Sequence, residues 1–105
     1  MPADGKRVVW SPKAKQDLRN IWRYFVRVAS PEVADKLLYE IAQAGKRAGE
    51  RPLLGRSREE VMPGLRSLLV HPYTIFYRVS DAGVEVVRVL HERRNFSTAF
   101  NKDER

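Results

Sequence analysis

Two Ser-Pro pairs constrain the fold of this 105-residue chain most strongly, because each marks a place where a helix can begin. A Ser side chain caps the free N–H groups at a helix start, and Pro is tolerated at the first helical position. After Ser11–Pro12 apolar residues recur at helical spacing, which predicts a helix over residues 12–28. After Ser30–Pro31 the same pattern predicts a second helix that ends near Gly49. The short link between them indicates an antiparallel helical hairpin.

The remaining segments read as strands. A short apolar run from Arg7 to Trp10 precedes the first helix, and "ERPLLGRSREEVMPG" (residues 50–64) reads as a charged loop with room for one helical turn. Three strand-like runs follow, "LRSLLV", "TIFYRV" and "VEVVRVL", joined by the turn-type linkers "HPY" and "SDAG". The final "NFSTAF" indicates a short helical turn. The order β-α-α-β-β-β predicts an α+β fold, with the helical hairpin packed on one face of a small antiparallel sheet.

Composition narrows the class of protein. The length indicates a single domain over residues 1–105, with a core over 7–100 and flexible ends at 1–6 and 101–105. The 20 Lys and Arg against 13 Asp and Glu give a net charge of +7, which favours acidic partners such as nucleic acid, an RNA-rich machine or an acidic protein. The absence of Cys excludes disulfides and thiolate chemistry. No membrane-spanning run, metal-ligand spacing or cofactor motif is visible, and we expect a cytoplasmic protein.

The last strand-like run ends in a cluster of charge, "VLHERRNF". Strand alternation puts Val87, Val89 and His91 on one face and Val86, Arg88 and Leu90 on the other. We expect the aliphatic pair to face the helices, which leaves Arg88 on the open face or under the C-terminal segment. On the neighbouring run we expect Tyr77 to lie in the core with its hydroxyl at the edge.

Two readings of the charged cluster stay open. A metal-free ribonuclease needs an acid, a base and cations near the phosphate, and His91 with Arg66 and Arg93 offers such groups. Alternatively, the cluster is a docking surface. The residues that we expect to bind a target are Arg66, Arg88, His91, Arg93 and Arg94.

At this point the chain resembles a known family. "VVWSPKAKQDLRNIWRYF" is similar to the opening strand and first helix of the ParE/RelE toxin superfamily. "MPGLRSLLVHPYTIFYRV" and "VEVVRVLHERRNF" are similar to its sheet, and the likeness runs from about Val8 to Phe96. The "HERRN" ending places the resemblance closest to the ParE branch.

The resemblance implies a toxin of a bacterial type II toxin–antitoxin system, of the kind that stabilises plasmids. Such a toxin is neutralised by a cognate ParD-like antitoxin in a hetero-oligomer such as a heterotetramer. The antitoxin, rather than the toxin, binds operator DNA. ParE-like members inhibit DNA gyrase by binding and block replication without being enzymes themselves.

The alternative is a RelE-like, ribosome-dependent mRNA endonuclease, for which Arg66, His91 and Arg93 are the catalytic candidates. RelE-like members typically carry a C-terminal Tyr, whereas this chain has Phe96 and Phe100 in that region. This departure favours the gyrase inhibitor. A third reading, a binding module without toxicity, is also compatible with the sequence.

Overall fold

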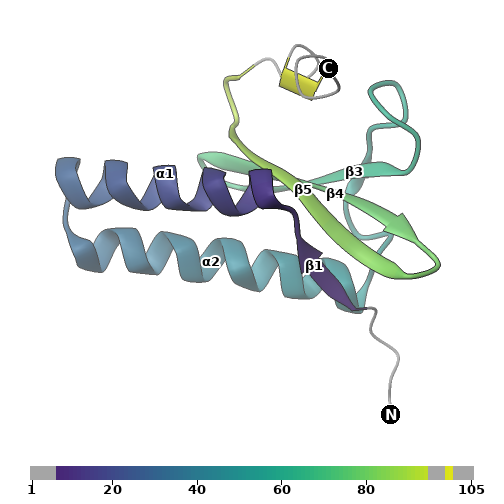
Figure 1. Cartoon of the computed structure of the whole chain (residues 1–105), viewed down its shortest axis with the longest axis horizontal. Helices are drawn as coiled ribbons and strands as arrows, with labels where there is room; N and C mark the ends of the chain where they lie inside the picture. Colours follow the sequence, from purple (N-terminus) through teal and green to yellow (C-terminus); the bar gives the residue numbers. More distant parts are fainter. Residues whose placement is uncertain (1–6, 95–98, 101–105) are drawn as a thin grey trace.

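The computed structural model describes residues 7–94 and 99–100, and its elements follow the predicted order with one addition (Figure 1). Two helices, α1 (Pro12–Val28) and α2 (Pro31–Glu50), run antiparallel along one side of the molecule. The strands are β1 (Val8–Trp10), β2 (Arg56–Ser57), β3 (Leu65–Val70), β4 (Tyr73–Ser80) and β5 (Gly83–His91). The predicted ends 1–6 and 101–105 lie outside the described residues, as do residues 95–98 of the predicted final turn.

Both helices begin as the Ser-Pro pairs predict. The Ser11 and Ser30 hydroxyls accept the N–H groups of Ala14 and Val33, at 3.0 and 3.1 Å. Each cap satisfies an amide that the first helical turn leaves free, and such caps stabilise a helix by about 1 kcal/mol. No helix within the described residues is both long and apolar enough to cross a membrane.

The strands form one mixed sheet in the order β1-β5-β4-β3-β2. The antiparallel meander β3-β4-β5 is confirmed, and β1 adds parallel to β5 through residues 84–86. The two-residue strand β2 lies inside the segment predicted as a loop, so that part of the prediction was wrong. Two residues flanked by charge carry too little periodicity to be recognised as a strand.

Two apolar clusters cover the two faces of the sheet. The larger cluster joins the buried faces of α1 and α2 to Ile75, Tyr77, Val84, Val86 and Val89. The smaller cluster, on the opposite face, joins Leu65, Phe76 and Leu90 to Ala99 and Phe100. The helical hairpin therefore packs on one face as predicted, and the end of the chain covers part of the other.

A β-bulge corrects the predicted faces of β5. Phe76 pairs with Arg88 but Tyr77 pairs with Val86, so Val87 is an extra residue in β5. An extra residue resets the alternation of a strand. Val86 and Val89 therefore both join the helix-facing cluster, whereas Val87 packs with the smaller one. The prediction was correct for Val89 and wrong for Val86 and Val87.

The first strand approaches α2 closely at a glycine. A Cβ atom added at Gly45 would lie 2.6 Å from Cζ2 of Trp10, a distance that requires the indole ring to move. Gly45 is itself buried, and the Trp10 ring occupies the space that any larger side chain would need. The small residue sets the spacing between β1 and α2.

We predict that Gly45→Ala destabilises the protein, although Ala favours a helix by about 1 kcal/mol over Gly. Overpacking against Trp10 should cost about 1–3 kcal/mol and exceed that gain. Urea unfolding measures the difference, and the cost should shrink in a Trp10→Phe background, which has a smaller ring. A Gly45→Ala protein more stable than the wild type would contradict this packing.

Candidate functional site

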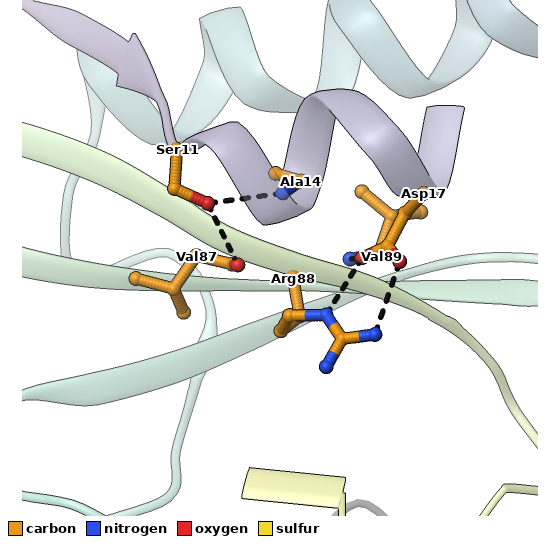
Figure 2. Close-up of polar contacts among 6 residues, drawn as sticks. All are labelled: Ser11, Ala14, Asp17, Val87, Arg88 and Val89. Carbon is orange, nitrogen blue, oxygen red and sulfur yellow. Dashed lines mark hydrogen bonds and ion pairs between the residues drawn. The ribbon is translucent and has the colours of Figure 1, made fainter. Parts of the chain in front are cut away.

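Side chains near the start of α1 hydrogen-bond to the part of β5 that β1 does not cover (Figure 2). β1 pairs with β5 only as far as Val86. Beyond it, the Ser11 hydroxyl donates to the Val87 carbonyl at 2.9 Å, and the Asp17 carboxylate accepts the Val89 amide at 2.9 Å. These two side chains continue the hydrogen bonding that β1 leaves unfinished, so this stretch of edge is not open for pairing with another strand.

Arg88 takes part in the same contact. Its Nε donates to Oδ2 of Asp17 at 2.8 Å and its Nη2 donates to Oδ1 at 3.0 Å, a bidentate ion pair. The two side chains are 10% and 13% exposed, so the pair is largely shielded from water. Removing one partner from such a pair leaves a buried charge, which typically costs about 3–5 kcal/mol.

This burial corrects the predicted position of Arg88 on an exposed docking surface. The residue lies on the predicted face of β5, beside Leu90, but its guanidinium points to Asp17 on α1 (Figure 2). Sequence reasoning missed Asp17. The sequence signal for it is helical spacing, because Asp17 lies three residues after Ala14 and four before Ile21, on the buried side of α1. A carboxylate in such a position needs a cationic partner.

Arg66 is also engaged with the protein itself. Its Nη1 donates to the Gly55 carbonyl at 2.7 Å and, more weakly, to the Leu53 carbonyl at 3.4 Å. The fully buried Tyr77 acts on the same segment, because its hydroxyl donates to the Pro52 carbonyl and accepts the Gly55 amide, both at 2.8 Å. The prediction that Tyr77 is a core residue is confirmed, whereas its hydroxyl is bonded to Pro52 and Gly55 instead of lying at an edge.

His91 and the two Arg residues at the end of β5 are exposed. His91, Arg93 and Arg94 all lie at the surface, and we call residues 91–94 the β5 terminus. The backbone is fixed there, since Glu92 N–H donates to the Pro72 carbonyl at 2.8 Å and Arg94 N–H to the His91 carbonyl at 2.9 Å. Nδ1 of His91 accepts the Arg93 amide at 3.1 Å.

Aromatic contacts attach the β5 terminus to α1. The ring of Tyr73 meets His91 edge-on at 5.4 Å between centroids and meets Phe25 at 6.4 Å, and Phe25 meets Tyr24 at 5.1 Å. Burial, and then the neighbouring Tyr24, raise the pKa of Tyr73. A raised pKa keeps this hydroxyl protonated well above neutral pH.

The structure separates one of the three nuclease candidates, Arg66, from the other two. His91 pairs with Tyr73, and Arg66 pairs with Tyr77 on the other side of β4. Four residues along a strand span about 13 Å, so Arg66 and His91 approach different ends of β4. Arg93 lies beside His91, whereas Arg66 is directed at the segment after α2. No group of three or more potential metal ligands occurs among the described residues.

Comparisons with known proteins agree with this architecture. Residues 8–96 match the family model described as "ParE toxin of type II toxin-antitoxin system, parDE". "Toxin ParE1" of Mycobacterium tuberculosis is 39% identical over 88 residues, which cover 83% of this chain and 90% of that protein. "Toxin ParE3" of Caulobacter vibrioides is 30% identical over 96 residues, 91% of this chain and 96% of that protein.

A solved structure shares the fold. The structure titled "Chromosomal ParDE TA system from P. aeruginosa" superimposes with a TM-score of 0.73 at 26% identity. The match covers 85% of this chain and 98% of that one. The described helices and strands are therefore arranged as in that structure.

The hydroxyl of Tyr77 gives a pH-dependent prediction. Burial raises its pKa above the ordinary value, and the Gly55 hydrogen bond and the Arg66 charge oppose that rise in part. The raised pKa contributes stability below the unfolded pKa of about 10, and this stability is lost as pH rises through the folded pKa. We predict that Tyr77→Phe is less stable than the wild type at pH 8 by about 1–2 kcal/mol, and that the gap narrows near pH 11.

Urea unfolding at pH 8, 10 and 11 measures that gap. Tyr39→Phe is the matched control, because the Tyr39 side chain is 65% exposed. A Tyr77→Phe gap that widened as pH rose would contradict the assigned environment of this hydroxyl.

Proposed function

The chain belongs to the ParE toxin family of type II toxin–antitoxin systems, and on that basis we propose that it binds DNA gyrase and thereby blocks replication. The observation that carries the proposal is the family match, which spans residues 8–96. The relatives are matched over nearly their whole length, so the likeness extends to the complete toxin fold. We place this action in the cytoplasm, where gyrase acts on DNA.

The β5 terminus supports an action by binding. Arg93 and Arg94 are exposed at the end of a strand whose backbone is fixed by hydrogen bonds and aromatic contacts. A fixed backbone avoids the entropy cost of ordering this segment on binding. Arg side chains can pair with carboxylates through two parallel hydrogen bonds. We propose that His91, Arg93 and Arg94 contact gyrase, while Arg88 holds the strand in place from inside.

A toxin of this kind has an antitoxin partner, and we propose that it is ParD-like. The outer side of the helical hairpin offers apolar surface for it: Trp22, Tyr24, Val28, Val33 and Tyr39 are all exposed. A hollow of about 450 Å³ between the helices is lined by Leu18, Arg19, Trp22, Arg23 and Leu38. An acidic, amphipathic antitoxin segment that folds on binding suits this mixture of apolar and cationic residues.

We predict that the purified protein inhibits gyrase supercoiling and that Arg93→Glu with Arg94→Glu weakens the inhibition by tenfold or more. Reversing two charges in a close interface costs on the order of 2–5 kcal/mol. The matched control is Lys15→Glu with Lys46→Glu, which makes the same change in net charge on exposed helix positions.

The supercoiling assay can also refute the proposal. Unchanged supercoiling, without trapped cleaved DNA, would refute gyrase as the target. Cuts in mRNA at the ribosomal A site would instead support the RelE-like reading.

A further inference from the structure

The segment between α2 and β2 exposes two adjacent large apolar side chains. Leu53 is 70% exposed and Leu54 is 39% exposed. Exposed Arg51 and Arg56 flank them, and residues 51–57 include no acidic residue. We call residues 51–56 the Leu53 tip. A shallow hollow of about 280 Å³ beside it is lined by Arg51, Pro52, Leu53 and Leu54.

The Leu53 tip is held from beneath by two side chains of the sheet. Tyr77 bonds the Pro52 carbonyl and the Gly55 amide, and Arg66 bonds the Gly55 carbonyl. Gly55 fits tightly, because a Cβ atom there would lie 2.6 Å from the Tyr77 hydroxyl and 2.7 Å from the Ser67 carbonyl oxygen. The sheet thus fixes three backbone groups of a segment whose Leu side chains point to solvent.

This segment differs from an ordinary surface loop, because its backbone is fixed by hydrogen bonds while its apolar side chains are exposed. Ordering a loop on binding costs entropy, and a segment that is already ordered avoids most of that cost. Adjacent exposed aliphatic side chains on a fixed backbone can enter an apolar pocket of a partner, while the flanking guanidinium groups pair with carboxylates at the rim of that pocket. The partner that fits is a protein with an acidic-rimmed apolar pocket.

A folded partner fits better than a disordered one. A segment that folds on binding lies along grooves or adds to strand edges, and it brings no preformed pocket for the exposed Leu53 side chain. We propose that the Leu53 tip is a preorganised docking element for the toxin's target protein, with Tyr77 and Arg66 as positioning residues. The identity of that target as gyrase rests on the proposed function.

The first test replaces the apolar pair by Leu53→Ser with Leu54→Ser in the full chain. The matched control is Val9→Ser with Leu69→Ser, at positions that are 49% and 63% exposed and lie outside both the Leu53 tip and the helical hairpin. Two readouts are compared: growth arrest on expression without antitoxin, and affinity for the cognate antitoxin by calorimetry.

We expect the Leu53 and Leu54 variant to need about tenfold more protein for growth arrest, while its antitoxin Kd stays within about threefold of the wild type. Wild-type growth arrest would overturn the inference. An equal loss of antitoxin affinity would also overturn it, because the tip would then serve the antitoxin or the fold.

The second test addresses positioning. Tyr77→Phe keeps the buried ring but removes the hydroxyl that accepts the Gly55 amide. We expect faster hydrogen exchange at Gly55, weaker growth arrest and unchanged antitoxin affinity. Faster exchange with full growth arrest would overturn the positioning role.

Growth arrest does not presuppose gyrase, so the two proposals fail separately. A toxic wild type that leaves gyrase unaffected would refute the proposed function and still test the tip. A tip variant that inhibits gyrase as well as the wild type does would refute the inference and leave the proposed function intact.

Discussion

The contact between the first turns of α1 and the edge of β5 is the constraint on which the structure depends. β1 is too short to cover β5, and the chain turns into α1 immediately afterwards. The Ser11 hydroxyl then donates to the Val87 carbonyl, and the Asp17 carboxylate accepts the Val89 amide. Arg88, which also lies on β5, forms an ion pair with the same carboxylate. One carboxylate therefore both closes a strand edge and compensates a buried guanidinium.

This contact divides the basic residues into two kinds. Arg88 and Arg66 are directed at other parts of the protein, and they fix α1 and the Leu53 tip respectively. Arg93 and Arg94 lie beyond the last strand and face solvent. Some of the cationic residues behind the net charge of +7 thus stabilise the fold, while others remain available to bind partners. A small domain can use Arg in both ways because its guanidinium stays protonated when buried.

Much of the fold could be predicted from the sequence, since helix starts and strand alternation are local signals. Ser-Pro pairs located both helices, and apolar alternation located β3, β4 and β5. The bulge at Val87 and the partner of Arg88 could not be predicted, because both depend on how distant segments align. The family resemblance indicated the class of protein but not which Arg side chains are buried. The exposed part of the predicted site could be predicted because residues 91–94 follow one another at the end of a single strand.

We propose that Arg88 supports the fold, whereas the exposed residues at the end of β5 and in the Leu53 tip contact the target. The most direct test is growth arrest by the Asp17→Asn, Arg88→Met double variant. Asn at that position retains an oxygen that can accept the Val89 amide, and Met fills the space of the Arg stem without a charge. We expect a folded protein that arrests growth as the wild type does. A variant that is folded, binds antitoxin and yet is harmless would contradict it, because Arg88 itself would then be needed at the target.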